Sequence, residues 1–488
     1  MRLYGNVCKS GSTSTRKTGQ RLEGDSVPAP HELTNRLRHP EFHGEIGVAS
    51  REITPPVGIY ARTWGSATHD VAEGVHRPLL ASCLLFRDLA RKTEMILITL
   101  DALVFWPLAA DKIRSIVQTR FRLQREQLIF HPSHSHSTPF LAQRHLDRPG
   151  GELIEPYLEW IPQVCCDLIE QARAAACEAV LSWAYGRCSL AFNRDAVDAA
   201  TGRDICGLNL LEAADDTVLV GRVTDRTGKI TATIVNYACH PVSLGGGNRL
   251  LSPDYIGAMR ELVQQETGGA LCVFFHGASG DMTPRRSYET QVEAADQNGR
   301  ELGFAALSVL ASMFPPGQQL QYMGIEESGT PLGVWRLRPK DSLSEKLSAQ
   351  LLSATLRVRE MPTREQIQAQ LATATEHYEI ERLERTLGRR ELAGDDLHAQ
   401  MPFTVWRLGD AFIVSTPAEP YSRFQQELRG AFPDAAVAVL NLSDGATTYL
   451  PKPAAFARDV YQVRVAIYEA DALQKVTEEA SAAIAAMS

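Results

Sequence analysis

The chain has 488 residues, of which 44% are hydrophobic and 22% are charged. This length allows a sizeable core, and the composition excludes wholesale disorder, a collagen-like repeat and a coiled coil. Lysine and arginine number 50 against 58 aspartate and glutamate, so the net charge of -8 provides no global basic field to attract nucleic acid or anionic lipid. Small-molecule chemistry is therefore favoured.

Residues 1–44 are rich in Ser, Thr, Gly and Pro without apolar periodicity, and this pattern predicts a disordered leader. The leader lacks the apolar segment of a secretory signal, and no run of the chain approaches the ~18 apolar residues of a membrane span. The cysteines number nine and include no Cys-x-x-Cys pair, which is typical of reduced thiols. These features predict a cytoplasmic protein without a transmembrane segment.

From Gly44 onwards, apolar β-rich runs alternate with amphipathic stretches. Strands are predicted at 94–100, 127–130, 217–223, 230–238 and 271–275. Helices are predicted at 155–180, 255–267, 288–313 and 420–429. This order predicts an α/β fold with mixed sheets flanked by helices, formed by one domain over residues 45–488.

Residues 342–400 differ from the rest of this domain, because they are charged and nearly free of glycine. They predict a charged helical insertion whose two helices are separated at Pro362. Strand character returns at 403–415 and at 435–440, so we expect the α/β core to resume after the insertion.

Histidines are concentrated directly after the predicted strand at 127–130, in the string His131-Pro-Ser-His134-Ser-His136-Ser-Thr-Pro. At a strand end, positions i and i+2 point to one side, so His134 and His136 can converge on a metal ion. A polar loop whose imidazoles bind backbone atoms is an equal alternative. Whether the string forms a metal site depends on further ligands from other segments of the sequence. The string does not continue as HxHxDH, which excludes the dinuclear site of metallo-β-lactamases.

A further histidine, His240, ends the apolar run IVNYACH and precedes a triple-glycine loop. Catalytic groups of α/β enzymes lie at such strand ends, although a half-buried structural histidine is the alternative reading. The run FFHGASGDMTP at 274–284 is a strand followed by small residues, which let the backbone approach a ligand closely. It is neither a Walker loop nor a GxSxG elbow.

Eight strings occur in an order that resembles the neutral/alkaline, non-lysosomal ceramidase family. They are GVASREITPP at 47–56, GVHRPLLASCLLF at 74–86, ITLDALVF at 98–105, HSHSTP at 134–139, FNRD at 192–195, NYACHPVSLGG at 236–246, SPDYIG at 252–257 and HGASGDMTP at 276–284. The resemblance spans 44–461, the catalytic domain of that family. About 25 residues follow, too few for the family's C-terminal immunoglobulin-like domain, so we expect that domain to be absent.

The resemblance implies a zinc amidase with one Zn²⁺ per chain, bound by two His, one Glu and one Tyr. It assigns His134 and His240 as the imidazole ligands. Glu419 in STPAEPYSRF matches the family's Pro-Gly-Glu, with alanine at the glycine position, and is expected to begin a helix. Tyr449 in DGATTYLP matches the family's Gly-Tyr-x-Pro, with threonine at the glycine position.

The resemblance further implies that His136, Arg194 and Tyr461 stabilise the oxyanion that forms when zinc-bound hydroxide attacks an amide carbonyl. His136 can also carry the proton to the leaving amine. Thr283 occupies the position at which one proposed mechanism for the family has a nucleophilic serine. Because no base is identifiable near it, we expect Thr283 to be structural.

The sequence therefore supports a zinc-dependent amidohydrolase that cleaves an N-acyl bond of a ceramide-like or other N-acyl amine, a small-molecule or lipid-like partner. Two alternatives stay open: a zinc hydrolase of a small soluble amide or ester unrelated to sphingolipids, and a non-catalytic metal-binding family member. Asp101 and Asp254 are candidates for fixing the imidazole tautomers, with local turn stabilisation as the alternative.

Overall fold

The computed structural model describes residues 35–104, 107–446 and 448–488, which fall into two compact units. Among the described residues, the smaller unit consists of residues 35–37 and 320–337. Its strands form one sheet in the order β1-β15-β16. Their bounds are Arg36–Arg38 for β1, Gln318–Glu327 for β15 and Pro331–Pro339 for β16.

The larger unit is built on an eight-stranded mixed sheet in the order β13-β11-β10-β7-β2-β4-β5-β6. In chain order the strands are β2 (Glu41–Glu52), β4 (Leu80–Arg87), β5 (Glu94–Leu100), β6 (Leu128–Pro132), β7 (Cys177–Arg187), β10 (Thr217–Asp225), β11 (Ile230–Tyr237) and β13 (Leu271–His276). The outer pairs β5–β6 and β11–β13 are parallel, whereas the inner pairs are antiparallel. The edge strands β6 and β13 meet at their ends, because the backbone N–H of His276 donates to His131 Nε2 at 2.8 Å.

A second, four-stranded sheet in the order β17-β18-β19-β21 packs on the inner face of the first. Its strands are Leu347–Arg357, His398–Leu408, Ala411–Ser415 and Ala436–Leu440. The core between the sheets includes Phe42, Trp183 and Phe275 from the larger sheet and Trp406 and Ile413 from the smaller one. Burial of such large apolar side chains supplies most of the favourable free energy of folding.

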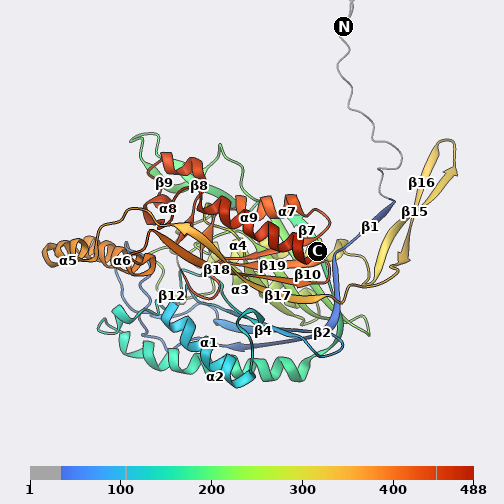
Figure 1. Ribbon diagram of the computed structural model, residues 1–488, viewed down its shortest axis with the longest axis horizontal. Coiled ribbons are helices and arrows are strands. Elements are labelled where there is room, and N and C mark those ends of the chain that lie inside the picture. The colour runs from blue at the N-terminus through green and yellow to red at the C-terminus, as the bar shows by residue number, and fades with distance from the viewer. Residues whose placement is uncertain (1–34, 105–106, 447) are drawn as a thin grey trace, which may run out of the picture. The chain divides into compact units, whose positions relative to one another are not determined.

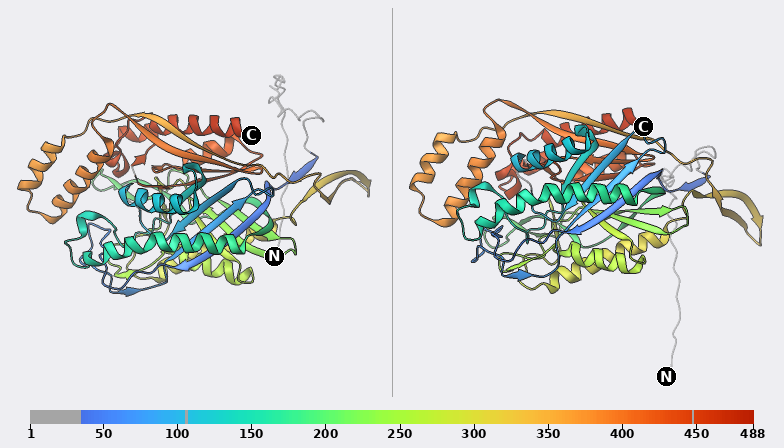
Figure 2. Two further views of the ribbon diagram at one scale, coloured as in Figure 1. Left: turned by 60° about the horizontal axis from the view of Figure 1, so that its bottom comes forward. Right: turned by 90° about the horizontal axis from the view of Figure 1, so that it is seen from below.

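Helices cover the outer faces of both sheets (Figures 1 and 2). On the eight-stranded sheet lie α1 (Pro107–Phe121), α2 (Ile154–Ala175), α3 (Tyr255–Glu266) and α4 (Glu293–Ser312). On the four-stranded sheet lie α7 (Arg423–Ala431) and α9 (Ala472–Met487). The predicted α/β fold with mixed sheets flanked by helices is confirmed.

The other strands and three further helices lie in the connections. They are β3 (Gly74–Val75) with β12 (Leu250–Leu251), β8 (Ala191–Val197) with β9 (Asp204–Asn209) and β14 (Met282–Pro284), β20 (Glu419–Pro420) with β22 (Tyr449–Leu450), and the helices α5 (Arg364–Thr373), α6 (His377–Ala393) and α8 (Tyr461–Val465). Within the described ranges no helix is both long and apolar enough to cross a membrane, and the cysteines are free thiols. Cys8 lies outside the described residues.

The helical insertion predicted at 342–400 is wrong in its first half. Residues Leu347–Arg357 form β17, which pairs along its length with β18. Ala354, Leu356 and Val358 are buried, and the residues between them are exposed. This alternation with a period of two is typical of a strand, but the charged composition of the whole stretch 342–400 outweighed it in the prediction. Pro362 precedes the two helices and does not separate them, since α5 begins after the capping residue Thr363.

Two other predicted boundaries are wrong for a tertiary reason. The helix predicted at 155–180 ends at Ala175, because Cys177 and the residues after it pair with β2 and β10. The leader predicted at 1–44 is too long, since β1 and β2 begin at Arg36 and Glu41. Residues 1–34 lie outside the described residues.

Glu41, which the prediction placed in the leader, is buried and paired. Its carboxylate accepts hydrogen bonds from Lys340 Nζ at 2.6 Å, Ser182 Oγ at 2.8 Å and the backbone N–H of Gly317 at 3.1 Å. Removing the carboxylate leaves the buried ammonium of Lys340 without this partner. We therefore expect Glu41→Ala to lower the free energy of unfolding by about 3 kcal/mol. Chemical denaturation measures the free energy of unfolding. The control is Glu52→Ala, an exposed position on the same strand, which should change the free energy of unfolding by less than about 0.5 kcal/mol. Equal losses in the two variants would contradict the prediction.

Candidate active site

The site histidines come from the ends of β6 and β11. His134 follows β6 by two residues, and His240 follows β11 by three. His134 has a positive φ of 65°, a conformation that costs a non-glycine residue about 1 kcal/mol or more. Its backbone is held there by the hydrogen bond from the His134 N–H to the Ala102 carbonyl at 2.8 Å. Both side chains are buried.

The structure brings His134, His136 and His240 into one cluster. One ring nitrogen from each lies within 4.8 Å of the others. The ring centroid of His134 is 4.9 Å from that of His136 and 5.0 Å from that of His240. Among the described residues, neither ring nitrogen of His136 has a hydrogen-bond partner, although both are buried. A polar loop whose imidazoles bind only backbone atoms does not account for His136, because its buried ring nitrogens have no such partner.

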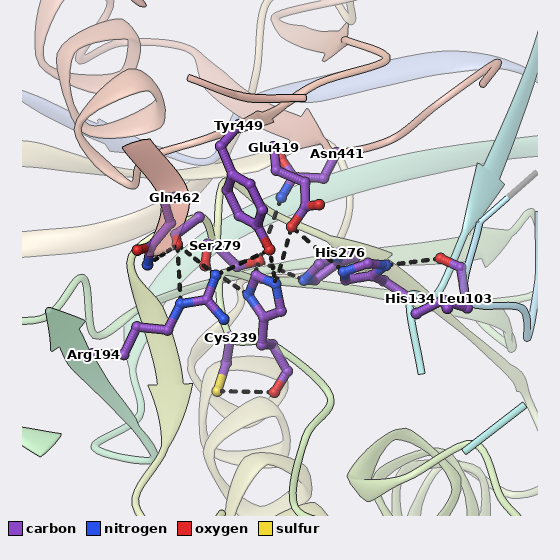
Figure 3. A network of polar contacts seen from close by, with 12 residues as sticks. Leu103, His134, Arg194, Cys239, His276, Ser279, Glu419, Asn441, Tyr449 and Gln462 are labelled. Carbon is purple, nitrogen blue, oxygen red and sulfur yellow. Dashed lines mark hydrogen bonds and ion pairs between the residues drawn. The ribbon is translucent and has the colours of Figure 1, made fainter. Parts of the chain in front are cut away.

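Backbone carbonyl groups fix the tautomers of two of these histidines (Figure 3). His134 Nδ1 donates to the Leu103 carbonyl at 2.7 Å, and His240 Nδ1 donates to the Ser279 carbonyl at 2.8 Å. A proton on each Nδ1 leaves Nε2 with a free lone pair. Asp101 and Asp254 do not have this role: Asp101 binds Arg260, and Asp254 caps α3 through the Tyr255 N–H.

Glu419 joins the two free imidazole nitrogens. Its Oε2 lies 3.0 Å from His240 Nε2 and 3.4 Å from His134 Nε2. Three atoms with lone pairs at these distances repel one another unless a proton or a cation lies between them. Two imidazoles and one carboxylate are also the donor set of catalytic zinc sites. These residues therefore fit a metal ion.

Tyr449 is placed beside Glu419 by a two-residue parallel pairing. β20 pairs with β22 in a register that sets Glu419 opposite Tyr449, so their side chains project to the same side. The Tyr449 hydroxyl lies 3.4 Å from His240 Nε2. The expectation that Glu419 begins a helix is wrong, because the pairing with β22 makes it a strand residue and α7 begins at Arg423.

The protonation states of the cluster suit metal binding. Burial lowers the pKa of His240 to about 3 and holds the pKa of His136 well below its usual value. Burial alone would raise the pKa of Glu419, but His134 and His240 outweigh it and hold this pKa well below the usual range. At neutral pH His136 and His240 are therefore neutral imidazoles and Glu419 is a carboxylate, the forms that bind metal without first losing a proton.

The other two predicted site residues surround Tyr449. Arg194 is buried and donates to the Gly280 carbonyl at 2.7 Å and to the Tyr449 hydroxyl at 3.2 Å (Figure 3). Tyr461 begins α8, and its ring centroid lies 6.0 Å from that of Tyr449. Tyr461 is 44% exposed, whereas His134, His240 and Glu419 are 9% exposed or less, so it marks the solvent side of the cluster.

Three residues near the candidate metal ligands were missed by sequence reasoning. Ser279 Oγ bridges His276 Nε2 at 2.7 Å and His240 Nδ1 at 3.0 Å, and the His276 ring stacks on His134 at 5.4 Å. Trp64 lies against His136 with ring centroids 5.0 Å apart. The string HGASGD carried a signal for the first two, because a buried histidine and serine around a tight turn need partners. Nothing local marks Trp64.

Thr283 lies in β14, opposite Phe192 of β8, and is fully buried. In the part of the chain that the structure describes, its hydroxyl hydrogen-bonds to no imidazole or carboxylate of the site. A hydroxyl without a base is a weak nucleophile. We therefore expect Thr283→Ala to keep at least about a tenth of the wild-type kcat/KM on an N-acyl amide. Loss of all activity, together with an acyl adduct on Thr283 in the wild-type mass spectrum, would make Thr283 the nucleophile.

No protein-family model matches the sequence, and neither does any curated protein. Among solved structures, a ceramidase complexed with C2 matches with a TM-score of 0.65 and 14% identity, over 92% of this chain and 76% of that chain. The neutral ceramidase from Pseudomonas aeruginosa matches with a TM-score of 0.65 and 14% identity, over 91% of this chain and 74% of that chain. At this identity the likeness is one of fold. The chain thus has the fold of the neutral ceramidases.

Proposed function

We propose that the protein is a zinc-dependent hydrolase of N-acyl amide bonds, acting on a ceramide-like or other N-acyl amine. One observation carries the proposal: Glu419 Oε2 lies 3.0 and 3.4 Å from the Nε2 atoms of His240 and His134. The fold that the chain shares with the neutral ceramidases supports the choice of an amide substrate.

His134, His240, Glu419 and Tyr449 would hold one Zn²⁺ per chain. When bound, zinc supplies a Lewis acid and a water molecule whose pKa is close to neutrality. The carbonyls of Leu103 and Ser279 support this set, because they hold the imidazole rings in the tautomer that directs Nε2 toward Glu419.

The remaining residues act on the amide in this proposal. Tyr461 and Arg194 would stabilise the negative charge that forms on the carbonyl oxygen, since both lie against Tyr449. His136 is neutral at neutral pH because burial lowers its pKa. A neutral imidazole can accept a proton from the attacking water and pass it to the amine nitrogen as the carbon–nitrogen bond breaks.

The experiment measures metal content and hydrolysis in the same preparation. Purified protein is assayed by mass spectrometry for about one zinc per chain, then incubated with an N-acyl sphingosine, an N-acyl ethanolamine and a simple acyl ester. Chelation should abolish amide cleavage, and added zinc should restore it. Cleavage of the ester alone would support the hydrolase of small esters, and zinc binding without any cleavage would support a non-catalytic metal-binding protein.

A further inference from the structure

A cavity of about 440 Å³ adjoins the solvent side of the candidate active site. Tyr461 lines it from α8, and Gly65 lines it next to Trp64, the residue that lies against His136. Its opposite wall is α6, which lies close to α8 in Figure 1. A molecule that enters the cavity therefore reaches Tyr461, whose ring in turn contacts Tyr449. We treat this cavity as the mouth of the site.

The mouth of the site is strongly cationic. Its lining includes two carboxylates, Glu360 and Glu381, and a larger set of arginines: Arg359, Arg382, Arg385, Arg389 and Arg464. The lining thus carries more positive than negative charge, in contrast with the net charge of -8 of the whole chain. A positive cavity in a negative protein concentrates anions at that point of the surface.

Two arginines of α6 in this lining, Arg385 and Arg389, are poorly neutralised, whereas Arg382 lies 3.7 Å from Glu379. Arg385 Nη2 is 4.0 Å from Glu381, which also lies 3.2 Å from Arg62 Nε. Arg389 donates to the Thr386 hydroxyl at 2.8 Å, and no carboxylate among the described residues lies within 4.0 Å of its guanidinium. Arg385 and Arg389 are four residues apart on one helix, so their like charges lie on the same face.

The position of Arg389 costs free energy in the absence of an anion. Burial lowers the pKa of Arg389, Arg385 and Arg382 lower it further, and the opposing effect of Tyr461 is smaller than the effect of burial. A partly buried cation beside two like charges is stable when an anion shares the site. The planar guanidinium binds carboxylate, sulfonate or phosphate groups through paired hydrogen bonds.

We propose that the substrate carries an anionic group, which Arg385 and Arg389 bind at the mouth of the site while the amide carbonyl lies against Tyr461. This inference rests on the proposed amidase function and narrows its substrate to N-acyl amides with a carboxylate, sulfonate or phosphate group. The chemistry at the amide bond is unchanged.

The test compares amides that share a twelve-carbon acyl chain and differ in charge. The first pair is N-dodecanoylglycine with its neutral match, N-dodecanoylglycinamide. The second pair is the mono-ethanolamide of dodecanedioic acid with its neutral match, N-dodecanoylethanolamine. We expect the zinc-loaded protein to cleave one anionic amide with a kcat/KM at least about tenfold above its neutral match. The preferred pair shows whether the amine or the acyl half carries the charge.

Variants of α6 then locate the binding groups. Arg389→Gln and Arg385→Gln should each lower the ratio of anionic to neutral kcat/KM by about tenfold, mainly through KM, whereas Arg389→Lys should keep part of the ratio. Arg364→Gln on α5 is the matched control, because Arg364 is exposed and pairs with Glu391 outside the cavity; it should leave the ratio unchanged. Zinc content and melting temperature show that each variant is folded.

The outcomes separate this inference from the function on which it rests. Cleavage of the neutral amides at least as fast as the anionic ones would overturn the anionic substrate and leave the amidase standing. Ratios unchanged by Arg389→Gln and Arg385→Gln in folded variants would also overturn it. Cleavage of none of the four amides by the zinc-loaded wild type would overturn the proposed function, and this inference with it.

Discussion

Replacing His240 by alanine is expected to abolish the proposed zinc binding and to lower the rate of amide hydrolysis by at least about 10³. Loss of an outer partner of a metal ligand already costs about 10- to 100-fold in affinity or activity, so loss of a ligand should cost more. His240 Nε2 lies 3.0 Å from Glu419 and 3.4 Å from the Tyr449 hydroxyl, which places it at the centre of the proposed donor set. His134→Ala should behave in the same way.

Zinc stoichiometry after dialysis measures this prediction, with the rate on an N-acyl amide as the second readout. His398→Ala is a suitable control, because His398 is an exposed histidine at the start of β18. It should keep both metal and activity. If His240→Ala keeps a full equivalent of zinc, then His240 is not a ligand and the metal lies elsewhere.

His136→Ala is expected to keep the metal and to lose about 10² to 10³ in kcat. Removal of one group that stabilises the oxyanion or transfers the proton typically has an effect of this size, and the affinity for metal should change little. The test is sharp, because a ring nitrogen of His136 lies within 4.8 Å of the ligand atoms of His134 and His240. Three histidines at such distances can also form a three-imidazole metal site.

The proposed ligand set and the three-imidazole set predict opposite results for the zinc content of His136→Ala. If His136→Ala releases zinc as readily as His134→Ala, the ligands are the three imidazoles, and the roles of Glu419 and Tyr449 need revision. His136→Gln adds a second comparison: a side-chain amide restores a hydrogen-bond donor but cannot carry a proton. Partial recovery of kcat in His136→Gln relative to His136→Ala would show that donation to the oxyanion dominates, and no recovery would indicate proton transfer.

Several features of the molecule follow from local sequence patterns. The apolar runs at 94–100, 217–223 and 271–275 form β5, β10 and β13, because a buried strand needs apolar side chains over its whole length. The position of His134 and His136 two residues apart after β6 was enough to predict that they lie close together. The order of eight short strings pointed to the fold that the solved ceramidase structures share with this chain.

Other features were decided only by tertiary structure, for one physical reason: they depend on which distant segments pair. β17 lies in the stretch 342–400, which as a whole is charged and reads as helical by composition, yet it is a strand because β18, across two helices, offers it a partner. Glu419 lies in the site because β20 pairs with β22, which also sets Tyr449 beside it. The cationic mouth arises where α6 meets α8, so that Arg389 lies near Tyr461. The local sequence predicts the spacing of apolar residues and which side chains are buried. Contacts between segments that are distant in the sequence are instead determined by the packing of the whole core.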